Sequence, residues 1–61
     1  MRWELFLSEG LGWLYLETFD SLNDAIDEII RMIMEREVEN AEGGDLSELT
    51  IDNFKLKEVK T

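Results

Sequence analysis

The segment Asp20–Ile33, with the sequence DSLNDAIDEIIRMI, decides the fold of this chain. Ser21 is a favoured N-cap residue, and Asp24, three positions later, approximates a capping box. The apolar residues that follow recur at offsets of 0, 3, 4, 7, 8 and 11, which is the period of one helical stripe. They are Leu22, Ala25, Ile26, Ile29, Ile30 and Ile33. We therefore predict an amphipathic helix that buries this stripe against a sheet.

The polar face of the predicted helix carries charges of both signs. Asp27, Arg31 and Glu35 are spaced four residues apart, which predicts two consecutive ion pairs on the solvent side. Three glutamates in the range 35–39 place negative charge near the negative end of the helix dipole, and the glycine pair at 43–44 ends the helix. Charge placed against the helix dipole indicates a functional compromise.

Two strands are predicted before the helix. Arg2–Ser8 and Trp13–Thr18 alternate in side-chain character, and Gly10 and Gly12 between them can supply the positive φ of a hairpin connection. If Trp3, Leu5, Leu7, Leu14 and Leu16 face the helix, the opposite face carries Phe6, Trp13 and Tyr15. The hairpin thus has one face for the core and one face that the helix does not cover.

A third strand is predicted after the helix. Leu49–Val59 has the composition of a strand, but Leu49 and Ile51 share one parity whereas Phe54 and Leu56 share the other. A bulge or break near residues 52–53 would place the apolar residues before and after it on the same face of the sheet. We therefore predict a single α+β domain over residues 1–61, with a three-stranded antiparallel sheet and one helix on one face, in the order strand, strand, helix, strand.

The composition excludes several kinds of site. The chain has no cysteine and no histidine, which excludes disulfides and His- or Cys-dependent catalysis or zinc binding. Carboxylates are plentiful, but a domain of this size has little room for the walled cleft that catalysis needs. We expect no enzymatic activity, no cofactor and no metal. The sequence also has no leader pattern and no membrane-spanning stretch, so we expect a cytoplasmic protein.

The net charge of −9 is the main indication of function. Between Asp20 and Glu48, ten carboxylates stand against two arginines, a net charge of −8. Direct binding to nucleic acid or to an anionic membrane is disfavoured because both repel the chain. Carboxylates on a rigid helix can instead occupy phosphate positions in a basic groove of another protein. The predicted acidic surface consists of Asp24, Asp27, Glu28, Glu35, Glu39, Glu42 and Asp45. A merely solvated surface and adaptation to high salt are the alternatives.

Aromatic residues provide a second hypothesis. Phe6, Trp13 and Tyr15 are predicted on the uncovered side of the sheet, and Trp and Tyr are enriched at interface hot spots. This aromatic face could anchor a partner or a second copy of the chain, which would make the protein a small homodimeric structural or assembly module. The competing explanation is that Phe6 or Trp13 lies in the core instead.

The segment Glu17–Ile30, ETFDSLNDAIDEII, placed between a hairpin and a closing strand, resembles small acidic phage-encoded inhibitors of host machinery. These include inhibitors of bacterial RNA polymerase and anti-CRISPR proteins, some of which mimic DNA. The resemblance covers the whole chain in outline, and residue by residue only the junction Thr18–Ala25. It implies a basic protein partner in a host bacterial cytoplasm and no enzymatic step, and it transfers no functional residue. We therefore expect an inhibitor that blocks a nucleic-acid-binding host protein.

Overall fold

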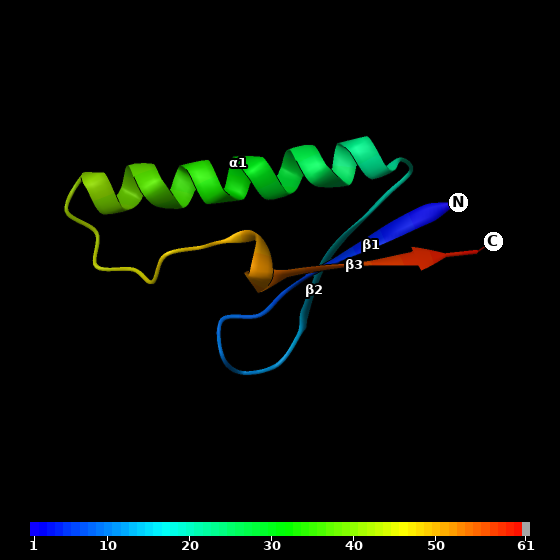
Figure 1. The fold of residues 1–61 in the computed structure, drawn as a ribbon, viewed down its shortest axis with the longest axis horizontal. Helices are drawn as coiled ribbons and strands as arrows, with labels where there is room; N and C mark the ends of the chain where they lie inside the picture. The colour runs from blue at the N-terminus through cyan, green and yellow to red at the C-terminus, as the bar shows by residue number, and fades with distance from the viewer. Residues whose placement is uncertain (61) are drawn as a thin grey trace.

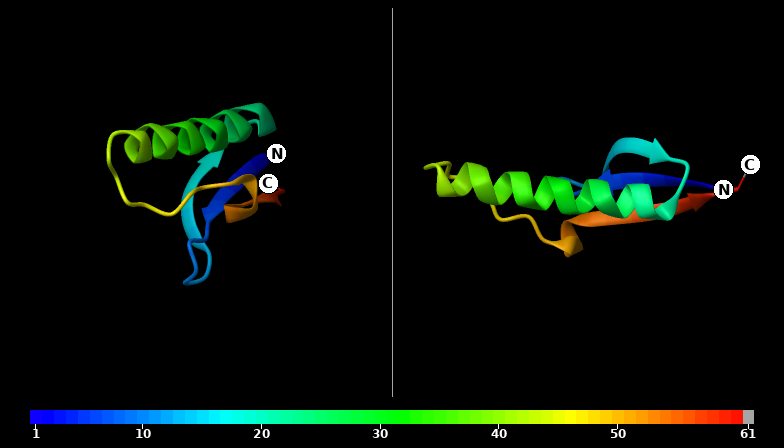
Figure 2. Two further views of the ribbon diagram at one scale, coloured as in Figure 1. Left: turned by 60° about the vertical axis from the view of Figure 1, so that its left-hand side comes forward. Right: turned by 90° about the horizontal axis from the view of Figure 1, so that it is seen from above.

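Three strands and one long helix make up the fold in the computed structural model, which describes residues 1–60 (Figure 1). The elements are β1 (Arg2–Leu7), β2 (Leu14–Phe19), α1 (Leu22–Ala41), the 3-10 turn η1 (Ile51–Asn53) and β3 (Phe54–Val59). The strands form one antiparallel sheet in the order β2-β1-β3, and α1 packs on one of its faces (Figure 2). The predicted α+β class and the order strand, strand, helix, strand are confirmed.

The core lies between α1 and the central strand β1. Leu5 and Leu7 of β1 are buried, and they lie opposite Leu56 and Phe54 of β3. The helix contributes Ile29 to this cluster. Because only a handful of residues are buried, the sheet and the helix depend on a small shared core.

The hairpin between β1 and β2 follows the prediction. Gly10 and Gly12 have φ values of 108° and 93°, a region that residues with a Cβ rarely adopt. The register shifts after Leu5, so that Leu16 is the additional residue of a bulge and packs against the core. Leu14 lies opposite Leu7 but is exposed, because the hairpin end of the sheet curves away from α1 (Figure 1). Leu14 thus shares the predicted sheet face with Leu7 but lies outside the core.

The helix begins as its sequence predicts. Ser21 has an extended backbone, and its Oγ accepts a hydrogen bond from the backbone N–H of Asp24 at 3.1 Å. This bond satisfies one of the N–H groups that the first helical turn leaves without a partner.

Ser21→Ala is expected to lower the free energy of unfolding by about 1 kcal/mol, because the Asp24 N–H loses its acceptor. Urea denaturation followed by circular dichroism measures this loss. Ser47→Ala is the matched control, since Ser47 is exposed and accepts a hydrogen bond only through its backbone carbonyl. Equal losses in the two variants would contradict the capping role.

The C-terminal half of α1 extends beyond the sheet and lies over the loop of residues 42–50 (Figures 1 and 2). Arg36 connects three segments there, because its Nη1 donates to Glu9 Oε1 at 2.9 Å and to the Ser47 carbonyl at 2.6 Å. The Oδ1 atom of Asn40 accepts from the backbone N–H of Leu46 at 3.1 Å. These bonds join the end of the helix to the hairpin and to the loop that follows the helix.

The helix ends at Ala41, where the glycine pair was predicted to stop it. Gly43 has a φ of 97°, and the backbone N–H of Gly44 donates to the Glu39 carbonyl at 2.9 Å. This hydrogen bond satisfies a carbonyl group of the last helical turn. The chain then turns away from the helix axis.

The predicted strand Leu49–Val59 is wrong in its first half. Leu49 is buried, but Ile51 is exposed, because η1 intervenes before β3 begins at Phe54. Asn53 stabilises this turn, since its Oδ1 accepts from the backbone N–H of Thr50 at 2.9 Å. The break predicted near residues 52–53 is thus a complete 3-10 turn.

The predicted helical stripe is also only partly buried. Ala25 and Ile29 are buried and Ile33 is half-buried, but Ile26 and Ile30 are exposed, as is Leu22. The cause is the position of α1, which packs mainly on β1 and β2. The side of the helix toward β3 is therefore covered incompletely.

Candidate protein-binding surfaces

The predicted acidic surface is largely accessible. Six of its seven members are exposed, namely Asp24, Asp27, Glu35, Glu39, Glu42 and Asp45, and Glu28 is half-buried. All but Asp45 belong to α1 or its C-cap. The helix thus positions these carboxylates along a rigid rod, and the following loop adds one more.

Arg31 forms one of its two predicted ion pairs, the one with Glu35, and it also pairs with Glu28. Its Nε donates to Glu28 Oε1 at 2.9 Å, its Nη2 contacts the other oxygen of Glu28, and its Nη1 contacts Glu35. The hydrogen bond to Glu28, and the charges of Glu28 and Glu35, raise the pKa of Arg31 above its ordinary value. The predicted Asp27–Arg31 pair is not formed, because the planar guanidinium binds both oxygens of Glu28 instead. Glu28 and Glu35 are therefore partly neutralised.

The remaining acidic residues of this surface form no ion pair with a basic residue among residues 1–60. Within residues 1–60, ion pairs join Arg2 to Asp20, Arg36 to Glu9 and Arg31 to its two glutamates. The unpaired members of the acidic surface are Asp24, Asp27, Glu39, Glu42 and Asp45. No basic residue lies in the last turn of α1, so the helix dipole adds to the negative potential at that end.

The predicted aromatic residues gather on the sheet face opposite α1. The rings of Phe6 and Tyr15 meet edge to face with centroids 5.8 Å apart. The Nζ atom of Lys55 lies 4.9 Å from the Phe6 ring centroid and 4.8 Å from that of Trp13. Trp13 and Tyr15 are 47% and 50% exposed, and neither Phe6 nor Trp13 belongs to the core. The predicted placement is confirmed, whereas the role of this face in binding stays a prediction.

Lys55 was not predicted at the aromatic face. It lies opposite Phe6 in the pairing of β1 with β3, and Lys57 lies opposite Glu4 on the same face. Only the strand register could have indicated this, because the sequence does not state which strands are neighbours. The outer sheet face is thus aromatic and partly basic, while α1 is acidic.

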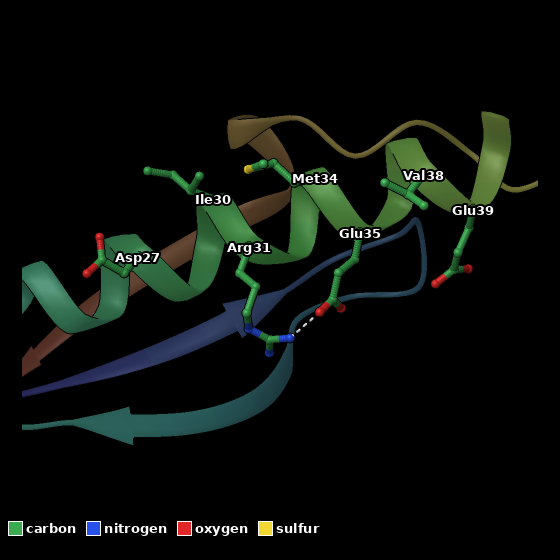
Figure 3. A pocket seen from close by; sticks show the side chains of 7 residues that line it. All are labelled: Asp27, Ile30, Arg31, Met34, Glu35, Val38 and Glu39. Atoms are coloured by element: carbon green, nitrogen blue, oxygen red, sulfur yellow. Dashed lines mark hydrogen bonds and ion pairs between the residues drawn. The ribbon is translucent and has the colours of Figure 1, made fainter. Parts of the chain in front are cut away.

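A groove along the outer side of α1 was also not predicted (Figure 3). Its apolar wall consists of Ile30, Met34 and Val38, of which Met34 and Val38 are 59% and 55% exposed. Its charged wall consists of Asp27, Arg31, Glu35 and Glu39. Both walls are rows at i,i+4 spacing on the same helix, and the groove is shallow and open to solvent, with a volume of about 550 Å³. The signal was present in the sequence, because Met34 and Val38 continue the spacing of Ile26 and Ile30.

A second apolar recess of about 390 Å³ lies between α1 and the β3 side of the sheet. Its lining is Ile26, Ile29, Ile30, Ile33, Ile51, Phe54 and Leu56. Ile30 belongs to both this recess and the helix groove, so the two apolar surfaces are continuous.

The described chain offers no preformed metal centre, since no three of its Asp, Glu, His or Cys side chains are grouped to hold an ion. No helix among the described residues combines the length and the hydropathy that crossing a bilayer requires. Comparisons with protein-family models, curated proteins and solved structures found no match. The functional argument therefore depends on the surfaces themselves.

Proposed function

We propose that the chain is a non-enzymatic inhibitor of the kind that phages encode. It binds a host protein that handles nucleic acid, such as a CRISPR effector or RNA polymerase, and it excludes DNA or RNA from the basic surface of that protein. The observation that supports this proposal is the series of unpaired carboxylates along α1 and the following loop, in a chain with a net charge of −9.

The length and rigidity of α1 suit this role. With 20 residues, the helix is roughly 30 Å long, comparable to about nine base-pair steps of a duplex. The helix holds the backbone positions of these carboxylates at fixed intervals, so little backbone entropy is lost when a basic groove binds them. Their field also accelerates the approach of a positively charged partner at low ionic strength.

The acidic surface can be tested with matched charge changes. One variant neutralises Asp24, Asp27 and Glu39, and a control neutralises Glu17, Asp52 and Glu58, which are exposed residues outside the acidic surface. Capture from a bacterial lysate is expected to yield a nucleic-acid-binding protein with the wild type and with the control. The first variant is expected to associate about tenfold more slowly with that protein, because the steering charge is lost where it contacts the partner.

Two further measurements decide the proposal. The captured protein should release labelled DNA or RNA as the wild-type chain is added, because both occupy the same basic surface. The affinity should also fall steeply between about 50 and about 500 mM salt. Binding that is insensitive to salt, or a stable complex that still contains the nucleic acid, would contradict the proposal.

Homodimerisation through the aromatic face is a second candidate, favoured by the half-exposed Trp13 and Tyr15 beside Phe6. In that case, sedimentation at micromolar concentration shows a dimer, and Trp13→Ala converts it to a monomer. A monomer in both samples excludes this candidate.

A further inference from the structure

We propose that the helix groove binds a basic amphipathic helix of the partner protein. This inference rests on the proposed function, because it names the element of the partner that the acidic protein contacts.

The shape of the groove suits a helix. Its two walls are neighbouring i,i+4 rows of α1, and the groove between two such rows receives the side-chain ridge of a second helix. From Ile30 to Val38 the apolar wall rises roughly 12 Å, or about two helical turns. A partner helix with apolar residues at i and i+4 therefore covers the side chains of Ile30, Met34 and Val38, which water otherwise contacts.

The charge of the groove selects a basic helix. Asp27 and Glu39 lie near the two ends of the charged wall, and neither has an ion-pair partner among residues 1–60. Arg31 between them is already bound by Glu28 and Glu35. Lysine or arginine residues beside the apolar stripe of the partner can pair with these two free carboxylates while the stripe fills the groove.

A second copy of the chain fits the groove less well. Two copies packed through this surface set one charged wall against the other, and each copy carries a net charge of −9. An anionic membrane surface is repelled for the same reason. Charge complementarity therefore favours a basic partner over self-association.

A synthetic peptide of about 18 residues, made only of leucine and lysine with leucine on one helical face, is a suitable probe. Its binding can be measured by fluorescence anisotropy. The control peptides are a scrambled sequence of the same composition and the same pattern with glutamate in place of lysine. We expect binding of the amphipathic basic peptide, weaker binding of the scrambled peptide and none of the acidic one.

Two double variants test the contributions of the apolar wall and of the charged wall to peptide binding separately. Met34→Ser with Val38→Ser is expected to weaken binding at least about tenfold, because both apolar contacts are lost. Asp27→Asn with Glu39→Gln is expected to weaken it about threefold to tenfold and to reduce its salt dependence. The controls are Leu11→Ser with Leu14→Ser and Asp52→Asn with Glu58→Gln, all at exposed positions outside the groove. Circular dichroism verifies that each variant is folded.

Several results would overturn the inference. Equal binding of the scrambled peptide, or equal losses in the control variants, would mean that general charge attraction explains the binding. Self-association that Met34→Ser with Val38→Ser abolishes would identify a second copy as the occupant.

The inference and the proposed function can fail separately. If Met34→Ser with Val38→Ser captures the nucleic-acid-binding protein as the wild type does, while the variant neutralised at Asp24, Asp27 and Glu39 associates with it more slowly, the inference fails and the proposed function stands. If the peptide binds in the groove but no captured protein binds nucleic acid, the proposed function fails instead.

Discussion

Replacing Leu5 by alanine is expected to leave most of the chain unfolded at room temperature. Leu5 is 0% exposed, lies in the central strand β1 and is the largest fully buried side chain among the described residues. Truncation of such a leucine costs about 3–5 kcal/mol, through lost transfer free energy and the cavity left behind. A core of this size rarely supplies more than about 3–5 kcal/mol in total. Circular dichroism and thermal melting measure the outcome.

Two control variants show whether the loss of stability comes from the burial of Leu5 or from the leucine substitution itself. Leu11→Ala removes the same atoms at a fully exposed position and is expected to change stability by less than about 0.5 kcal/mol. Leu5→Met nearly conserves volume and is expected to cost less than about 1.5 kcal/mol. A cooperative melting transition of Leu5→Ala within a few degrees of the wild type would show that the core lies elsewhere.

Asn53→Ala is expected to produce the second largest loss, about 1–3 kcal/mol of unfolding free energy, because two hydrogen bonds of about 0.5–1.5 kcal/mol each are lost. The side-chain Nδ2 of Asn53 donates to the Ser8 carbonyl at 2.9 Å, and its Oδ1 accepts from the Thr50 N–H at 2.9 Å. Alanine leaves both backbone groups without these partners, at the point where the hairpin meets the turn before β3. Urea denaturation gives the magnitude.

Asn53→Asp tests the two bonds separately, because aspartate keeps the acceptor for Thr50 and loses the donor to Ser8. Its expected loss is intermediate. Asn23→Ala, at an exposed position on α1, is expected to change stability little. Hydrogen exchange of the Ser8 N–H, which donates to the Asn53 carbonyl at 2.8 Å, should accelerate in Asn53→Ala. Unchanged exchange would contradict the connecting role of Asn53.

The helix was the most predictable element because its signals are local. The Ser21 cap and the glycines after Ala41 act on backbone groups within a few residues, and both behave as predicted. The start of β3 was not predictable in the same way. The Asn53 side chain joins Ser8, which is 45 residues away in the sequence, and a turn replaces the first part of the expected strand.

The candidate surfaces also combine features that local sequence predicts with features that only the tertiary structure sets. Residue parity predicted that Phe6 and Tyr15 share the sheet face opposite the helix, and the structure places their rings in contact. Parity did not predict Lys55 beside them, because that contact follows from the pairing of β3 with β1. The Arg31–Glu35 pair was predicted, but the Arg31–Glu28 pair was missed, because several carboxylates lie within reach of Arg31 and side-chain geometry selects among them.

The sequence by itself determined the α+β class, the helix with its cap and glycine stop, the hairpin and the concentration of negative charge on one segment. These follow from period, from turn chemistry and from composition, which act over short distances along the chain. The tertiary structure decided that α1 packs on β1 and β2, which leaves Ile30 exposed beside Met34 and Val38. Burial depends on which surfaces meet in space, so periodicity alone could not separate a core stripe from a groove wall.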